Sequence, residues 1–181
     1  NHNYTFYYFI EKLNSKEIYN LNRKINIILR NYVDDLDTID LKGLVNLCHK
    51  RQQKVFLAND IKRAFCYKFD GVYIPSFNKL CNFKNLMFRK NFKIIGSAHK
   101  VDEIIIKKKQ NCSEIFTSPI FKTYKKKYLG VIRFNLLNLT NRSKIIALGG
   151  INENNISKLK LTKSVGFASI SWIKKNRPTI K

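Results

Sequence analysis

The sequence predicts a single (β/α)8 barrel, or TIM barrel, whose last helix is short or missing. Eight short apolar segments alternate with segments of helical periodicity along the 181 residues, as expected for a parallel sheet built from β/α units. Polar or small residues follow most of these apolar segments. A hydrophobic content of 44% argues against a disordered chain, and the length fits one domain over residues 1–181.

Four strands are expected in the first half of the chain, each from a run of β-branched or aromatic residues. They cover residues 4–10, 25–30, 54–60 and 71–74. Between these runs the apolar residues recur at helical spacing. Helices are therefore expected from Ser15 onward, with Ser15-x-Glu17 as a cap region, and over residues 37–53 and 62–69.

The second half of the chain repeats this alternation. Its expected strands cover residues 92–97 and 114–117, a run from Lys144 to paired glycines, and residues 165–171. Its expected helices cover residues 83–91, 101–109, 132–139 and 154–161. The tail of residues 174–181 contains Pro178 and is too short for a full final helix.

Polar residues at the ends of the expected strands predict a site on one rim of the barrel, because all strands of such a barrel end there. They are Arg30, Asn59, Asp60, Ser97, the loop of residues 117–126, the pair Gly149-Gly150, and Ser171. The backbone N–H groups of Gly149-Gly150 and Ile170-Ser171 can form a cup for a phosphate, since glycine lets an anion approach the backbone. The alternative is a Gly-Gly turn that only ends a strand.

The formal net charge of +23 raises the question of a nucleic-acid partner. We do not expect one, because the positive residues are spread along the chain without a nucleic-acid module. The runs at residues 107–109, 125–127 and 174–175 are interpreted as solvated faces or helix ends.

The four cysteines form no Cys-x-x-Cys pair and are expected to be reduced and mostly buried. Without a membrane span or signal peptide in the sequence, a cytoplasmic location is expected.

Several motifs in order resemble those of the thiamine phosphate synthase/TenI family of barrels. Gly96-Ser-Ala-His99 is similar to its Ser-x-His segment, and Ser118-Pro-Ile-Phe-Lys-Thr123 with Lys126 to its Gly-Pro-[Ile/Val]-[Phe/Tyr]-x-Thr-x-x-Lys loop. Residues 147–152 and 168–171 match its phosphate cup. Asn59-Asp60 stands where the family has Asn-Asp, and Arg30 where it has the Arg of Gln-x-Arg-x-Lys.

The resemblance implies an enzyme of thiamine biosynthesis that uses Mg²⁺ to join hydroxymethylpyrimidine diphosphate to thiazole phosphate, releasing pyrophosphate. A pyrimidine cation would form first, and the thiazole nitrogen would then attack it. Arg30, Ser97 and Lys126 would be catalytic, acting on the diphosphate, and Asp60 and Asn78 would hold the metal. The substrate-binding residues would be Asn59, Thr123, Gly149, Gly150, Ile170 and Ser171, the last three mainly through backbone N–H groups.

Three departures from the family pattern fall on the pyrimidine side of the implied site. Ile28 and Tyr32 replace the Gln and Lys of Gln-x-Arg-x-Lys, and Asn78 replaces a carboxylate, which should weaken Mg²⁺ binding. The alternative is therefore a non-catalytic or differently catalytic TenI-like protein that binds thiazole phosphate or another small phosphate through the cup. The family's tautomerase branch uses a histidine in the loop after the sixth strand, where this chain has Pro119.

Two of these residues also have ordinary structural explanations. Asp60 precedes Ile61 and can act as a helix N-cap, which is a common role for aspartate. His99 is expected to cap the following helix and not to take part in catalysis. The sequence leaves a homodimer open.

Overall fold

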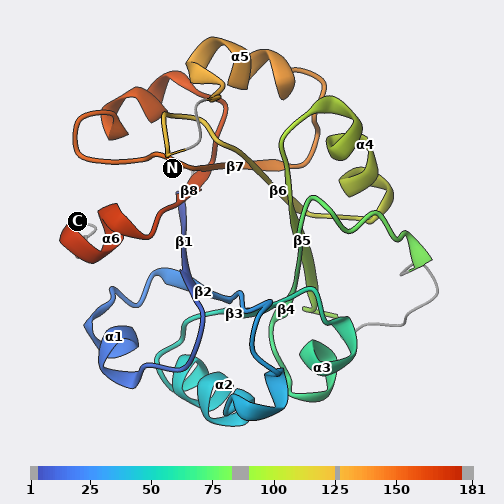
Figure 1. Ribbon diagram of the computed structural model, residues 1–181, viewed down its shortest axis with the longest axis vertical. Helices are drawn as coiled ribbons and strands as arrows, with labels where there is room; N and C mark the ends of the chain where they lie inside the picture. Colours follow the sequence, from blue (N-terminus) through green and yellow to red (C-terminus); the bar gives the residue numbers. More distant parts are fainter. Residues whose placement is uncertain (1–3, 83–89, 125–126, 177–181) are drawn as a thin grey trace.

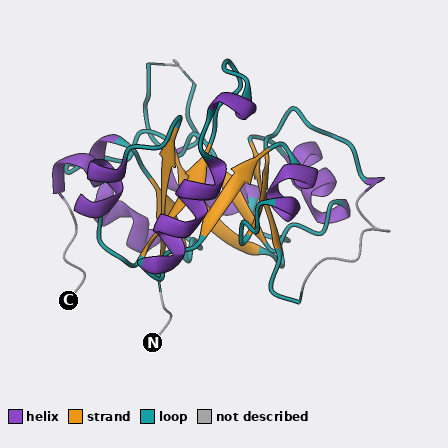
Figure 2. Cartoon of the chain, turned by 90° about the horizontal axis from the view of Figure 1, so that it is seen from below, coloured by secondary structure: helices purple, strands orange, loops and turns teal. Residues whose placement is uncertain are grey.

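The computed structural model describes residues 4–82, 90–124 and 127–176 and shows a closed barrel of eight parallel strands in sequence order (Figure 1). The predicted fold class is confirmed. The strands are β1 Thr5–Ile10, β2 Ile25–Leu29, β3 Val55–Ala58, β4 Gly71–Ile74, β5 Lys93–Ala98, β6 Glu114–Thr117, β7 Lys144–Leu148 and β8 Gly166–Ala168. Seen from the side, long loops extend beyond one end of the barrel (Figure 2).

Helices surround the barrel: α1 Ser15–Asn20, α2 Leu41–Lys50, α3 Ile61–Cys66, α4 Val101–Lys109, α5 Gly130–Leu137 and α6 Ser171–Asn176. Two short 3₁₀ helices, η1 Leu36–Thr38 and η3 Ile156–Leu161, complete the described elements. The last described helix, α6, is short, with six residues, and the sequence predicted a short or missing last helix. Most of the helix expected at 83–91 lies outside the described residues.

The helix expected from Ser15 begins there, with Asn14 as its N-cap. Two other helix predictions were wrong in detail, each because side chains bond to the backbone. The helix expected from residue 37 begins only at Leu41, because the Asp40 side chain accepts a hydrogen bond from the Gly43 N–H. The α-helix expected at 154–161 is a 3₁₀ helix. The Asn152 and Asn155 side chains accept backbone N–H bonds before it, and such bonds compete with α-helical ones.

Aromatic side chains fill the inside of the barrel. Tyr7 and Phe9 of β1 point inward, while their neighbours Tyr8 and Ile10 pack against the outer helices. The inward rings meet edge to face, with centroids 4.9 Å apart for Tyr7 and Phe116 and 5.4 Å apart for Phe9 and Tyr73. This packing fills the inside of the barrel below the rim.

The run of lysines at 107–109 is not a uniformly solvated face, because Lys107 is fully buried. Its ammonium donates hydrogen bonds to the carbonyl oxygens of Pro75 (2.8 Å) and Asn78 (3.0 Å) and to Gln110 Oε1 (2.8 Å). The Gln110 amide nitrogen also donates to Asn78 O (2.9 Å) and Leu80 O (2.8 Å). Lys107 and Gln110 therefore fix the backbone of the loop that follows β4.

We expect Lys107 to make the stability of the protein depend on pH. Burial lowers the pKa of its amine to about 8, from an ordinary value of 10.5. The unfolded chain therefore binds more protons between these two values, so the free energy of unfolding should rise with pH across this window. The full shift corresponds to about 3 kcal/mol. Urea unfolding of the wild type and Lys107→Met at about pH 7 and pH 10 measures this, since other titrating groups cancel in the comparison. Equal changes in both proteins would contradict it.

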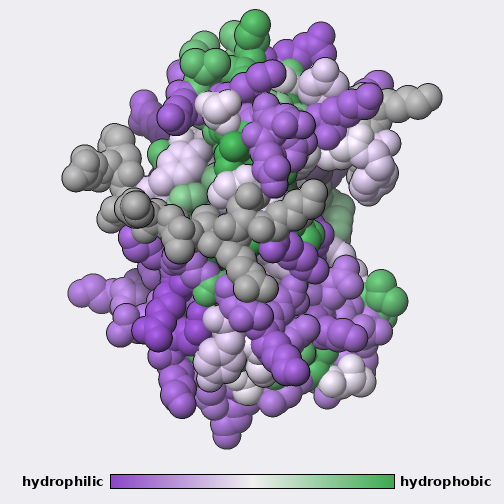
Figure 3. All heavy atoms as spheres, turned by 90° about the vertical axis from the view of Figure 1, so that its left-hand side faces the viewer, coloured by the Kyte–Doolittle hydropathy of each residue, from purple (hydrophilic) through white to green (hydrophobic). Residues whose placement is uncertain are grey.

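The outer surface is mostly hydrophilic, and Figure 3 shows this on one face, with hydrophobic side chains gathered at the end where α5 lies. In α5, Ile132 and Leu136 are both exposed.

Two of the four cysteines are buried, Cys48 and Cys112, while Cys66 is exposed. No helix in the described part of the chain has the length and apolar character needed to cross a bilayer.

Candidate functional site

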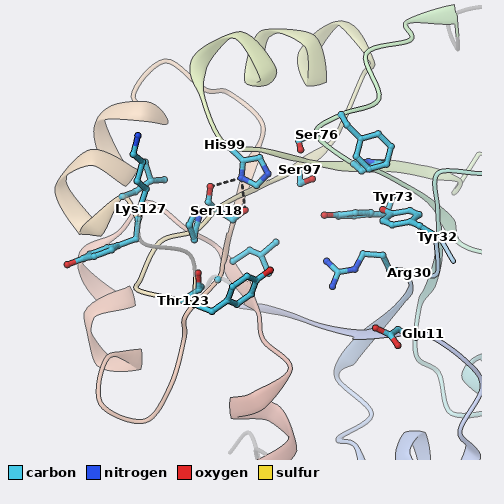
Figure 4. A pocket seen from close by; sticks show the side chains of 18 of the residues that line it. Glu11, Arg30, Tyr32, Tyr73, Ser76, Ser97, His99, Ser118, Thr123 and Lys127 are labelled. Carbon is cyan, nitrogen blue, oxygen red and sulfur yellow. Dashed lines mark hydrogen bonds between the residues drawn. The ribbon is translucent and has the colours of Figure 1, made fainter.

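An open cavity of about 1770 Å³ lies at the rim formed by the carboxyl ends of the strands. Four of the predicted site residues line it: Arg30, Ser97, Thr123 and Gly149. Figure 4 shows Arg30 with Tyr32 and Tyr73 on one side, His99 and Ser97 in the middle, and Thr123 with Lys127 on the other side. The predicted residue Lys126 lies outside the described residues, but its neighbour Lys127 lines the cavity.

Arg30 supplies a cation at the first end of the cavity. Strand β2 ends at Leu29, and the Arg30 guanidinium lies over the Phe9 ring, with its central carbon 4.4 Å from the ring centroid. Within residues 4–82, 90–124 and 127–176, no carboxylate lies within 4.0 Å of it. A half-buried arginine without a carboxylate partner, facing a cavity, is suited to bind an anion.

Two of the departures from the family pattern have visible structural consequences here. Ile28 is fully buried among the aromatic rings inside the barrel, so this position contributes packing and not hydrogen bonding. Tyr32 is 49% exposed and meets Phe77, from the loop after β4, edge to face with centroids 5.6 Å apart. Both rings line the cavity. The Tyr32 and Phe77 rings therefore line the cavity at the position where the family pattern has a lysine.

Ser97 and Tyr73 form the floor between the two ends. Ser97, near the end of β5, is 5% exposed and lies beside Tyr73. Burial raises the pKa of the Tyr73 hydroxyl, although the Ser97 hydroxyl beside it and the Arg30 charge oppose this shift. Tyr73 therefore stays protonated at neutral pH and can donate a hydrogen bond.

His99 lies at the middle of the cavity and does not cap α4, so the expected capping role was wrong. The N-cap is Lys100, and the His99 backbone N–H donates to Glu103 Oε2 at 2.7 Å. The imidazole Nδ1 lies 2.8 Å from Ser118 O and 3.1 Å from Ser118 Oγ (Figure 4). Because a carbonyl only accepts, Nδ1 carries the proton and Nε2 is left to contact a ligand.

This position of His99 could not be read from the chain, because Ser118 is 19 residues away. The loop after β6 has Pro119 where the tautomerase branch of the family has a histidine. His99, which directly follows β5, lies beside this loop in space. The signal that could have indicated it is the pairing of β5 with β6, which sets Ala98 beside Thr117 and hence the following residues close together.

The paired glycines are held against the loop after β6 at the second end of the cavity. The N–H groups of Ile120 and Phe121 donate to Leu148 O (3.0 Å) and Gly149 O (3.1 Å). Gly149 and Gly150 have φ angles of +95° and +72°. A Cβ on Gly150 would lie 2.5 Å from the carbonyl oxygen of Phe121, so glycine is required at this position.

Strand register brings the two segments of the predicted cup together, because Leu148 of β7 lies beside Ala168 of β8. This places Gly149-Gly150 next to the segment that begins at Ser169. Within the described residues, the N–H groups of Gly149, Gly150 and Ile170 donate no hydrogen bond. Of these three residues, Gly149 lines the cavity, so its N–H can meet an anion bound there. The side chain of Ser171 lies outside the described atoms.

Asp60 and Asn78, the two predicted magnesium ligands, are engaged elsewhere. Asp60 is the N-cap of α3, as its alternative interpretation stated, and Oδ1 accepts from the Arg63 N–H at 2.8 Å. Its Oδ2 accepts from Arg63 Nη1 at 2.8 Å, and Arg63 also pairs with Asp37 at 2.9 Å. The described residues include no cluster of three or more acidic, histidine or cysteine side chains that could hold a metal. These residues do not fit Mg²⁺.

Asn59, a predicted substrate-binding residue next to Asp60, is also engaged within the protein. Its side-chain oxygen accepts a hydrogen bond from the Asn78 amide nitrogen at 2.7 Å, while Asn78 Oδ1 accepts from the Leu80 N–H at 3.0 Å. Both polar atoms of the Asn78 side chain are thus used within the protein. Neither Asn59 nor Asn78 is among the residues that line the cavity.

We expect Asp60→Ala to lower the free energy of unfolding by about 1 kcal/mol or more, because it removes the cap of α3 and the partner of Arg63. Asp60→Asn is the matched control, since asparagine caps helices about as well as aspartate. It should lose much less stability. Urea unfolding of both variants measures the difference. Equal losses would show that the cap contributes little and that the charge of Asp60 dominates.

Comparisons with known proteins agree with this geometry. The family model described as thiamine monophosphate synthase matches residues 21–173. A thiamine-phosphate synthase of Prochlorococcus marinus is 33% identical over 145 residues, which is 74% of this chain but only 39% of that protein. The chain therefore spans well under half of the length of this relative.

Solved structures show the same fold. A thiamine phosphate pyrophosphorylase from Pyrococcus furiosus superposes with a TM-score of 0.78 at 17% identity, covering 94% of this chain and 87% of that one. A thiamine phosphate pyrophosphorylase from Bacteroides thetaiotaomicron gives a TM-score of 0.63 at 17% identity, covering 98% and 87%. At these identities the likeness concerns the fold alone. It is the match of the family model over most of the sequence that shows that the chain belongs to the thiamine monophosphate synthase family.

Proposed function

We propose that this chain is a transferase of thiamine biosynthesis that joins hydroxymethylpyrimidine diphosphate to thiazole phosphate. The observation that carries the proposal is one cavity with the Arg30 guanidinium at one end and Gly149 at the other, where the N–H groups of Gly149 and the adjoining Gly150 donate to no described residue. The two substrates carry their anionic groups at separate places, and their reacting atoms must meet between them. We also propose that residues 1–181 act as a single domain.

In this proposal the reaction breaks the bond between the pyrimidine methylene carbon and the diphosphate oxygen, and the electron pair leaves with pyrophosphate. The thiazole nitrogen then gives its lone pair to the methylene carbon, forming the new carbon–nitrogen bond. The Arg30 guanidinium stabilises the negative charge that develops on the departing group. No step is routed through Mg²⁺, because Asp60 and Asn78 are engaged within the protein.

Three further side chains have roles that their positions support. Ser97 lines the cavity and is placed to hydrogen-bond the diphosphate. His99, held by Ser118, presents Nε2 to the middle of the cavity, where it can accept a hydrogen bond when neutral and donate one when protonated. Thr123 lines the cavity at the phosphate end. Lys126 stays a prediction from the sequence.

A second candidate is a TenI-like protein that binds thiazole phosphate, or another small phosphate, without this transfer. The observations that favour it are the buried Ile28, the aromatic Tyr32 in place of a lysine and the engaged Asp60. His99 would then be the side chain placed to move a proton on the bound ring, since its Nε2 faces the cavity.

Turnover distinguishes the two candidates. The purified protein is mixed with both substrates and Mg²⁺, and thiamine phosphate is detected by its fluorescence after oxidation. The transferase predicts product that is lost in Arg30→Met. Absence of product from a folded protein whose melting temperature still rises with thiazole phosphate would reject the transferase in favour of the second candidate.

A further inference from the structure

Besides Arg30, the carboxylates of Glu11 and Asp34 line the cavity, but among the described residues they belong to no group of three or more acidic, histidine or cysteine side chains that could hold a metal. Asp60 is the carboxylate that the family pattern predicts as a metal ligand. One of its oxygens accepts from the Arg63 backbone N–H and the other from the Arg63 guanidinium. The hydrogen bonds that Arg63 donates to Asp60 and Asp37 raise the pKa of its guanidinium, so it remains charged. A divalent metal could use Asp60 only by displacing two charge-assisted hydrogen bonds and leaving Arg63 with less compensation.

The loop that carries Asn78 is also unsuited to a divalent cation, because a positive charge already lies beneath it. The buried Lys107 ammonium is 3.0 Å from Asn78 O and 2.8 Å from Pro75 O. These carbonyl oxygens, which a hard metal would otherwise select, are directed at Lys107. A second cation beside this loop would be repelled by the ammonium in surroundings that screen charge poorly.

Arg30, by contrast, has no carboxylate partner within the described ranges, and it lines the cavity. Its guanidinium has five N–H donors in a planar fork that matches two phosphate oxygens at once. We infer that this end of the cavity binds a phosphate or diphosphate anion directly through Arg30, without a bridging divalent metal. The inference rests on the proposed function for the identity of the ligand, but it concerns binding and not turnover.

The experiment titrates inorganic pyrophosphate into the full chain by calorimetry, once with EDTA and once with Mg²⁺, after correction for the pyrophosphate that Mg²⁺ binds in solution. The expected dissociation constants agree within about threefold, which is under 1 kcal/mol. Binding that requires Mg²⁺, or that Mg²⁺ strengthens tenfold or more, would overturn the inference.

Asp60→Asn is the matched variant, because it removes a carboxylate charge while keeping a side chain that can cap α3. It should leave the dissociation constant unchanged under both conditions. A loss of binding in Asp60→Asn that appears only with Mg²⁺, while the melting temperature stays near that of the wild type, would show a metal site at Asp60 and overturn the inference. Titration of the free protein with Mn²⁺ gives a second readout, and tight binding of one ion that Asp60→Asn removes would count equally against it.

Failure of the proposed function would look different. If pyrophosphate binds equally with EDTA and Mg²⁺ but no thiamine phosphate forms, the transferase is rejected and the direct mode of anion binding stands. If turnover occurs but only Mg²⁺-pyrophosphate binds, the transferase stands and the inference falls.

Discussion

Replacing Arg30 with methionine is expected to weaken pyrophosphate binding by about a hundredfold while leaving the fold intact. Arg30 is the cation that faces the first end of the cavity, and within the described ranges no acidic side chain pairs with it. A guanidinium that binds two phosphate oxygens loses two charge-assisted hydrogen bonds when it is removed, and about 3 kcal/mol corresponds to a hundredfold change in affinity. Calorimetric titration measures the dissociation constant directly.

Methionine is chosen because its length allows it to keep the contact with Phe9, over which the guanidinium now lies. The melting temperature should therefore change by only a few degrees. Arg30→Lys is the charge-preserving control. It keeps the positive charge but loses the planar fork, so about a tenfold weakening is expected. Wild-type affinity in Arg30→Met would assign the anion to another part of the cavity, such as Lys127 and Arg133.

The strands and the rim could be predicted from the sequence because each depends on local pattern. In a barrel covered by helices both faces of each strand are buried, so runs such as Val55–Ala58 and Glu114–Thr117 are short and mostly apolar. The residues that follow them then meet at one rim by topology alone. This is why Arg30, Ser97, Thr123 and Gly149 could be placed at one cavity from the sequence.

The partners of polar side chains could not be predicted in the same way, because they come from distant parts of the chain. Asp60 is tied through Arg63 to Asp37, 26 residues from Arg63, and His99 is held by Ser118. Neither contact follows from spacing. These contacts decide whether Asp60 can hold a metal and where the imidazole of His99 points.

Lys107 is a case in which the sequence did contain the signal. Successive residues of a helix point about 100° apart, so three consecutive lysines in α4 cannot all face solvent on one side. Lys107 follows the buried Ile104 by three residues and therefore shares its inward face. The interpretation of residues 107–109 as a solvated face did not take this periodicity into account.

Replacing Gly150 with alanine is expected to lower the free energy of unfolding by at least about 3 kcal/mol. The residue has a φ of +72°, which costs an L-residue about 1 kcal/mol. The added Cβ would also lie 2.5 Å from the carbonyl oxygens of both Phe121 and Lys122, which are backbone atoms and cannot rotate away. The loop after β6 would have to move, and with it the backbone N–H groups of the cup.

Gly130→Ala is the matched control, because Gly130 has a similar φ of +68° but nothing within 4 Å of an added Cβ. The free energy of unfolding of Gly130→Ala should fall only by about 1 kcal/mol, which is the cost of a positive φ for an L-residue. Urea unfolding of the two variants separates the conformational cost, which they share, from the close approach, which only Gly150 has. Equal losses would mean that the loop after β6 moves aside at little cost.

The same pair of variants tests whether the cup binds phosphate. Thiazole phosphate should raise the melting temperature of wild type and Gly130→Ala alike, because the cup is intact in both. In Gly150→Ala the rise should be absent, since the Gly149 and Gly150 N–H groups are displaced together with the loop. A full rise in Gly150→Ala would place the phosphate elsewhere in the cavity, because an anion bound by these N–H groups cannot tolerate their movement.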